Sequence, residues 1–307
     1  MSKRPPSRAD GTAAGGAGKR RAVLTLVSQP SSTGITDAST GIIDVTKEYN
    51  KESEEKVKTA LKTRGYALLK LMEPTDGHIQ RFRKLIFARG QKIEKESGEP
   101  IRSGIIQVSG YNTLVEELKT TTNFGTRIEA IFKTAHGADK ELHASNDGLI
   151  YWRAGLRNSV ELGPPHIDQP FKSREITYQG MLLLTGQNPE TGGLAFADKS
   201  VSSESLTVLN EGMQTASSKV PSTVVTAPAG TFIIWSSTKL HHGKGPLGGG
   251  LTEPRAALLL AYNPAPEKRN SVNRHVAKGL SPYASQKGWV VENLQAAFTD
   301  LGTGRRR

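Results

Sequence analysis

Apolar residues recur at helical spacing in the first half of the chain. Between residues 54 and 64, Val57, Ala60 and Leu61 share one helical face, and Gly65 follows as a stop signal. Residues 66–71 then form a short apolar run that predicts a strand. A second helix is expected from Pro74, because proline suits the first helical position, and a third is expected over residues 126–135. The residues spaced for burial on these two helices are Ile79, Phe82, Leu85, Ile86, Ile128, Ile131 and Phe132.

From about residue 148 the pattern changes to short apolar runs that are broken by Gly, Pro, Ser and Asn. Such runs at even spacing are typical of strands in an all-β architecture. The predicted strands cover residues 149–155, 176–186, 192–197, 222–227, 230–235 and 256–262. Helices first and many short strands afterwards favour a mainly β fold with flanking helices, in the form of a two-sheet jelly roll.

Length and charge suggest how the chain is organised. Its 307 residues carry a net charge of +12, of which residues 1–24 and residues 266–307 contribute +5 each, so that residues 25–265 keep only +2. We therefore expect a flexible basic N-terminal tail over residues 1–45, one domain over residues 46–265 and a basic C-terminal extension over residues 266–307. The N-terminal tail is rich in Gly, Ala, Pro and Ser, a composition that buries too little apolar surface to order itself.

The composition also excludes some classes of protein and leaves others open. The chain has no cysteine, which excludes disulfides and thiolate metal sites. No apolar run is long enough to span a bilayer and the N-terminus lacks the apolar core of a secretory signal, so we expect a soluble intracellular protein, cytoplasmic or nuclear, without a membrane partner. The basic tails could contact nucleic acid without sequence preference, act as a nuclear import signal, or only improve solubility. The oligomeric state is left open.

The most informative chemistry lies in the sequence PPHIDQPF, where His166 and Asp168 stand two residues apart. A second imidazole follows at His242, and Arg255 comes thirteen residues after it. Two imidazoles and one carboxylate can occupy one face of an octahedral metal ion and leave positions open, as in non-haem Fe(II) oxygenases. An arginine fork suits a dicarboxylate such as 2-oxoglutarate. A short His-x-Asp motif also arises by chance, and His241-His242 could be a polar turn, but the order strand, His-x-Asp, strand, His, Arg, strand favours a metal site.

At these residues the chain resembles the phytanoyl-CoA dioxygenase family of Fe(II)/2-oxoglutarate oxygenases. The resemblance runs from about Thr63 to Asn263 and rests on the segments TRGYALLKLMEP, HIDQPF, NPETGGLAF, HHGKGP and PRAALLLAY. In the third of these segments, Pro189, Glu190, Gly192 and Gly193 keep the shape of the family's mid-domain motif. The resemblance implies a double-stranded β-helix, the cupin-like jelly roll.

The same resemblance implies a role for each candidate site residue. His166, Asp168 and His242 would be the catalytic metal ligands for Fe(II), and Arg255 would bind the distal carboxylate of 2-oxoglutarate. Polar residues of neighbouring strands that could join the co-substrate pocket are Tyr151, Thr231 and Gln179, and each could equally face solvent. Candidates for substrate contact are Phe171, Lys172 and Arg153. Trp235 is expected in the core.

Two adjacent histidines compete for the position of third ligand. Neighbours in a strand point to opposite faces, so only one of them can face the interior. Family members commonly follow the ligand with Gly, a small residue and Gly-Pro, which fits His242-Gly243-Lys244-Gly245-Pro246 and favours His242 over His241. The chain departs from the family pattern at three places. Asp198-Lys199-Ser200 after the mid-domain strand changes a loop only. Lys244, where a small hydroxyl residue is usual, and the glycine run 248–250 bear on the details of co-substrate binding but not on its existence.

The resemblance implies an oxygenase that consumes O2 and 2-oxoglutarate and releases succinate and CO2. Related halogenases replace the ligand carboxylate with a small residue, so the presence of Asp168 favours hydroxylation. The favoured substrate is a small organic molecule of unknown identity. Two alternatives stay open: an oxygenase acting on nucleic acid or on a nucleic-acid-associated protein, with the basic tails as tethers, and a non-catalytic jelly-roll binding protein.

Overall fold

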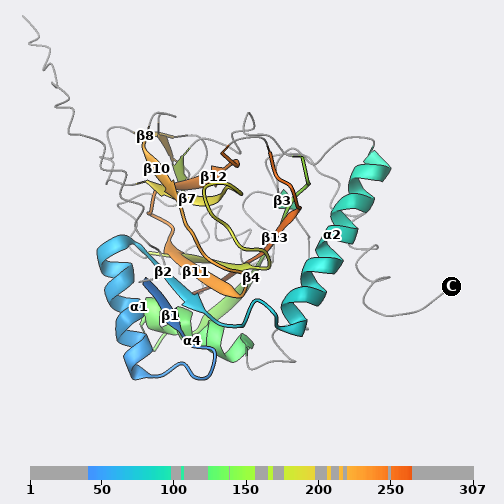
Figure 1. Ribbon diagram of the computed structural model, residues 1–307. Coiled ribbons are helices and arrows are strands. Elements are labelled where there is room, and N and C mark those ends of the chain that lie inside the picture. The colour runs from blue at the N-terminus through green and yellow to red at the C-terminus, as the bar shows by residue number, and fades with distance from the viewer. Residues whose placement is uncertain are drawn as a thin grey trace, which may run out of the picture. The chain divides into compact units, whose positions relative to one another are not determined.

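Two β-sheets form the centre of the part of the chain that the computed structural model describes (Figure 1). The structure describes residues 41–97, 105–106, 124–137, 139–155, 165–168, 176–197, 206–208, 214–216, 220–247 and 250–264. All of them fall within one of the chain's two compact units, residues 37–307. The predicted N-terminal tail up to residue 40 and the C-terminal extension lie outside the described residues.

The larger sheet has seven strands in the order β1-β2-β11-β6-β13-β4-β3. Its pairings are antiparallel except for β1 with β2, which is parallel. The strands are β1 (Ile42–Asp44), β2 (Tyr66–Lys70), β3 (Ile105–Ile106), β4 (Leu142–Trp152), β6 (Tyr178–Leu183), β11 (Thr231–Ser236) and β13 (Arg255–Pro264).

The smaller sheet has six antiparallel strands in the order β10-β7-β12-β5-β9-β8. They are β5 (His166–Ile167), β7 (Gly193–Ala197), β8 (Leu206–Val208), β9 (Gln214–Ala216), β10 (Ser222–Val224) and β12 (His241–Lys244). Successive strands along the chain alternate between the sheets from β4 to β7 and again from β10 to β13. The predicted double-stranded β-helix is therefore confirmed.

Three helices cover one face of the larger sheet: α1 (Lys51–Arg64), α2 (Gly77–Ser97) and α4 (Phe124–His136) (Figure 1). Helix α1 begins three residues before its predicted start because the side chain of Asn50 accepts a hydrogen bond from the backbone nitrogen of Ser53, at 3.1 Å, and so caps the helix. It ends as predicted at Gly65, whose φ of 77° is the left-handed conformation that glycine adopts without strain. Phe132 of α4 packs against Phe232 of β11 beneath the helices.

The other face of the larger sheet packs against the smaller sheet. Because side chains alternate along a strand, odd-numbered residues of β6 and β11, such as Met181 and Trp235, point into this inter-sheet interior, whereas Leu182 and Phe232 point to the helices. Phe196 of β7 meets them from the smaller sheet. Apolar side chains thus pack on both faces of the larger sheet, and the candidate site lies in the interior between the two sheets.

Several elements differ from the sequence-based expectations. Strand β1 pairs with β2 although it precedes the predicted domain start at residue 46. Strands β1, β3, β5, β8, β9 and β12 were not predicted, because runs of two to four residues are too short to show an alternation of apolar and polar side chains. In the described part of the chain, no helix is long and apolar enough to cross a membrane.

We expect Phe132→Ala to lower the free energy of unfolding by about 3–5 kcal/mol, because it leaves a cavity where helix α4 meets β11 and Tyr262 of β13. Urea unfolding followed by circular dichroism measures the loss. The control is Lys133→Ala, which removes only the exposed ion pair of Lys133 with Glu129 and should change the free energy by less than about 1 kcal/mol. Equal losses for the two variants would contradict the packing described.

Candidate functional site

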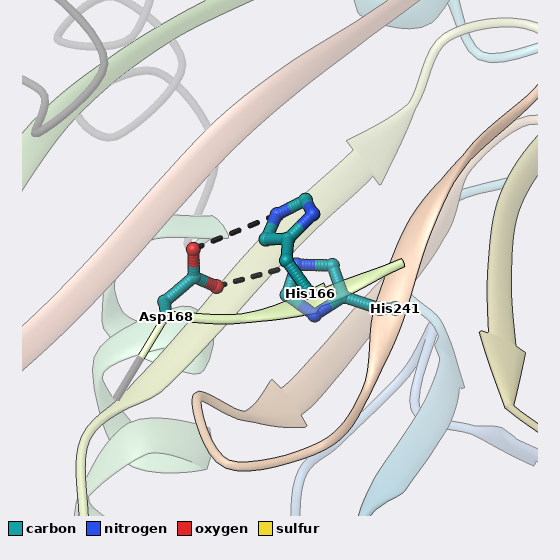
Figure 2. A group of neighbouring side chains, drawn as sticks. All are labelled: His166, Asp168 and His241. Atoms are coloured by element: carbon teal, nitrogen blue, oxygen red, sulfur yellow. Dashed lines mark ion pairs between the residues drawn. The ribbon is translucent and has the colours of Figure 1, made fainter. Parts of the chain in front are cut away.

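Three side chains converge at the end of the inter-sheet interior: His166, Asp168 and His241 (Figure 2). His166 lies on β5 and His241 at the start of β12, and the antiparallel register pairs the two residues directly. Asp168 follows β5, where its backbone nitrogen donates to the backbone oxygen of Ser237 at 2.9 Å. Residues 75 positions apart in the chain are thus brought side by side by strand pairing alone.

The geometry of this group fits a metal ion. Asp168 Oδ2 lies 3.3 Å from Nε2 of His241, and Asp168 Oδ1 lies 3.7 Å from Nε2 of His166. One nitrogen or oxygen atom from each residue falls within 4.8 Å of the others. The side chains are 5–16 % exposed, so the group lies largely out of water. Two imidazoles and one carboxylate in this arrangement offer the donor set of a facial triad.

His241 is held in the form that a metal ligand requires. Its Nδ1 lies 2.8 Å from the backbone oxygen of Lys239, an acceptor, so Nδ1 carries the hydrogen and Nε2 keeps a free lone pair toward Asp168. Burial lowers the pKa of His241 to about 4, against a smaller opposing effect of Asp168. The imidazole is therefore neutral near pH 7 and available to a cation.

A glutamine orients the carboxylate of the group. Gln179 of β6 donates from Nε2 to Oδ2 of Asp168 at 2.7 Å. Gln179 was expected to line the co-substrate pocket, whereas in the structure it contacts Asp168, a candidate metal ligand. Holding Oδ2 in this way directs Oδ1 toward the space beside His166 and favours coordination through one oxygen.

The structure brings His241, and not His242, to the pair, and this corrects the third ligand predicted from the sequence. His241 lies opposite Phe196 and so faces the interior, whereas His242 lies opposite Ala195 on the outer face of the smaller sheet. There the Nε2 of His242 is 2.7 Å from the hydroxyl of Ser222. Burial, and to a smaller extent the nearby charge of Lys244, lowers the pKa of His242 to about 4. The residues after the histidines favoured His242, but the alternation of side chains is fixed by the pairing with β7, which the sequence did not reveal.

Arg255 is a buried cation without a carboxylate partner in the described part of the chain. Its guanidinium stacks on the Trp152 ring, 4.4 Å from the centroid, and Nη2 donates to Oε1 of Gln187 at 3.0 Å. Nε and Nη1 are buried and find no hydrogen-bond partner among the described residues. Burial lowers the pKa of Arg255 to about 9, so it is still charged near pH 7. Such a group fits a bound anion, because an unpaired buried charge is costly.

Other buried polar atoms also lack a described partner. They are the hydroxyl of Thr231 and the indole nitrogen of Trp235, both on odd-numbered positions of β11, and the amide nitrogen of Gln187. Trp235 fills the core as predicted, with its ring 5.4 Å from that of His241. Thr231 remains a candidate for the co-substrate pocket. Gln187 was missed from the sequence, although it directly precedes the segment NPETGG that was singled out.

The remaining predicted residues do not join the group. Tyr151 is buried on the helix side of β4, where its hydroxyl donates to Glu94 of α2 at 3.5 Å, and burial raises its pKa to about 12. It therefore lies on the opposite face of β4 from Trp152, and its predicted place in the co-substrate pocket is corrected. Arg153 is exposed just beyond the end of β4. Phe171 and Lys172 lie outside the described residues.

Comparison with known proteins identifies the fold of this chain but not its family. No family model matches the chain. No curated protein matches it either. Among solved structures, the GlcNAc-inducible protein GIG2 (DUF1479) from Candida albicans is 14% identical, with a TM-score of 0.50 over 74% of this chain and 68% of that protein. At this identity the likeness shows a shared fold only.

Two further solved structures resemble the chain more weakly. SnoN, a non-heme alpha ketoglutarate dependent epimerase from nogalamycin biosynthesis, is 16% identical, with a TM-score of 0.47 over 70% of this chain and 84% of that one. EvdO2 from Micromonospora carbonacea var. aurantiaca, complexed with 2-oxoglutarate, is 14% identical, with a TM-score of 0.43 over 72% of this chain and 93% of that one. A shared fold does not determine a function, so the function of this chain has to be argued from its own site.

The adjacent histidines give a matched pair for testing the metal site. We expect His241→Ala to weaken binding of Co(II), a spectroscopic substitute for Fe(II), by more than roughly 100-fold. Loss of a hydrogen bond to a metal ligand costs roughly 10–100-fold in affinity, and this variant removes a ligand itself. His242→Ala should leave the affinity within a few-fold of the wild type, because its imidazole contacts Ser222 instead. Titration of the metal-free protein followed by visible absorption measures both. Loss of binding in His242→Ala with retention in His241→Ala would reverse the assignment.

Proposed function

We propose that this protein is an Fe(II)- and 2-oxoglutarate-dependent dioxygenase of the phytanoyl-CoA dioxygenase type that hydroxylates a small organic substrate. One observation carries the proposal. His241 of the His166–Asp168–His241 group faces the interior between the two sheets. Arg255 stands two residues before Ala257 of β13, which lines the same interior, so the alternation of side chains along the strand places the buried guanidinium, with its Nε and Nη1 lacking described partners, on that side of the sheet. A metal-ligand set alone would fit many metalloproteins, whereas a ligand set together with an enclosed anion site fits an enzyme that binds an acidic co-substrate beside its metal.

Each residue of the group would contribute one ligand atom to the metal. His166 and His241 would each contribute one imidazole nitrogen, and Asp168 would contribute Oδ1, the oxygen that does not accept the hydrogen bond from Gln179. The neutral state of His241 lets it bind without first losing a proton. Bound there, Fe(II) would supply the redox chemistry with O2 that couples decarboxylation of 2-oxoglutarate to substrate hydroxylation.

Arg255 would bind and orient the co-substrate. Its planar fork is stacked on Trp152 and tied to Gln187, which leaves Nε and Nη1 as donors of fixed direction for a carboxylate. The low exposure of the pocket excludes water and strengthens this pairing. Thr231 is proposed as a further, neutral contact because its buried hydroxyl faces the same interior.

The choice of reaction and substrate follows from the ligand set and its surroundings. Asp168 would occupy the coordination position that a halide needs, which supports hydroxylation. The group's low exposure supports a small substrate that can enter a confined interior, rather than a folded macromolecule. An oxygenase acting on nucleic acid through the basic tails is the alternative, and removal of residues 1–40 and 266–307 would reduce substrate affinity and its salt dependence only in that case.

Asp168→Ala should reduce the formation of succinate from 2-oxoglutarate by at least about 100-fold, because it removes the one anionic ligand of the group. The assay supplies Fe(II), ascorbate and O2 and measures succinate released without added substrate. Asp44→Ala, which removes an exposed carboxylate of β1, is the control and should match the wild type. Succinate formation by Asp168→Ala at the wild-type rate would contradict the proposed role of Asp168.

Arg255→Met should weaken binding of 2-oxoglutarate to the Mn(II)-loaded protein by roughly 10–100-fold, as expected for loss of a hydrogen bond to a charged group. The same variant should unfold at an equal or higher temperature in the absence of 2-oxoglutarate, because methionine keeps the contact with Trp152 and removes a buried charge. Calorimetric titration and thermal unfolding measure the two effects. Unchanged affinity together with a large loss of stability would make Arg255 a structural residue.

A further inference from the structure

The side chain of Gln187 lies against Arg255 in a fixed orientation. It is 2% exposed, and its Oε1 accepts two hydrogen bonds, from Nη2 of Arg255 at 3.0 Å and from the backbone nitrogen of Leu194 at 3.2 Å. Both partners are donors, so the amide oxygen must occupy this position and the amide nitrogen the other one. The backbone of Gln187 is fixed as well, because its nitrogen and oxygen each bond to Ala227 at 2.9 Å.

This orientation leaves a cluster of buried donors. Nε2 of Gln187 is bonded to the same carbon as the oxygen that Arg255 contacts, so it lies close to the guanidinium. Nε2 of Gln187 and Nε and Nη1 of Arg255 are all buried without a hydrogen-bond partner among the residues that the structure describes. Folded proteins rarely leave buried donors unsatisfied, and each exception calls for an explanation. A buried charged donor group beside a buried neutral donor matches a bound carboxylate.

We propose that Gln187 donates through Nε2 to the distal carboxylate of a 2-oxo dicarboxylic acid and, with Arg255, selects dicarboxylic over monocarboxylic 2-oxo acids. This inference rests on the proposed function, which it deepens by naming a second residue of the co-substrate site. Arg255 neutralises the charge of the carboxylate, and Gln187 fixes its direction without adding a second charge to a buried site.

The glycine motif next to Gln187 explains how the amide reaches this position. A Cβ atom on Gly193 would lie 2.4 Å from Oε1 of Gln187 and 2.7 Å from its Cδ, so any other residue there would displace the amide. At Gly192, which has a φ of 67°, a Cβ atom would lie 2.4 Å from the backbone oxygen of Lys244. The pair of glycines thus lets β7 approach both Gln187 and β12, and it ties the sequence motif to the donor cluster.

The test compares two five-carbon acids that differ only at the distal end, 2-oxoglutarate and 2-oxopentanoate, by calorimetric titration of the Mn(II)-loaded full-length protein. The wild type should bind 2-oxoglutarate more tightly. In Gln187→Leu this advantage should shrink about tenfold, with little change for 2-oxopentanoate. Gln80→Leu makes the same replacement at an exposed position of α2 and should keep the wild-type ratio of affinities.

Gln187→Glu is a second variant of nearly the same shape. Its carboxylate should keep the contacts of Oε1 with Arg255 and Leu194, pair with the guanidinium and so raise the unfolding temperature while abolishing the preference for 2-oxoglutarate. A wild-type ratio of affinities in both folded Gln187 variants would overturn this inference and leave the proposed function standing. Failure of the wild-type protein to bind either acid would overturn both.

Discussion

Backbone pairing between β5 and β12 sets His166 directly opposite His241, and the rest of the site is built around that contact. The pairing with β7 on the other side of β12 turns His241 to the interior and His242 to the outer face. Lys239 then fixes the tautomer of His241, and Gln179 reaches across from the larger sheet to hold Asp168. A slip of one residue in β12 would exchange the two histidines, so the register of a four-residue strand decides which imidazole can bind a metal.

A second feature, the buried guanidinium of Arg255, is unfavourable to the fold taken alone. The ring of Trp152 and the amide of Gln187 hold it in place, but they offset its charge only in part, and the apolar layers on both faces of the larger sheet keep water away. Such a group makes physical sense where an anion completes the site. Stability and function therefore make opposite demands at this position, as is common where binding groups are preorganised.

Much of this arrangement could be predicted from the sequence, and the failures have physical causes. The helices and long strands follow from apolar periodicity, and His166, Asp168 and Arg255 stand out because of their spacing. The choice between His241 and His242 depended on strand register, which comes from partners far away in the chain. Tyr151 was expected in the pocket as a polar residue of a neighbouring strand, but the structure places it on the helix side of β4, opposite to Trp152. Gln187 has no marked local pattern, and only its contact with Arg255 draws attention to it.

The central claim is that one interior binds Fe(II) and 2-oxoglutarate together. The most direct measurement is an anaerobic titration of the full-length protein with Fe(II) and then 2-oxoglutarate, followed by visible absorption. The account predicts a metal-to-ligand charge-transfer band that appears only when both are present, since both must occupy the same site. Folded protein that binds Fe(II) but gives no band with 2-oxoglutarate, or binds neither, would contradict it.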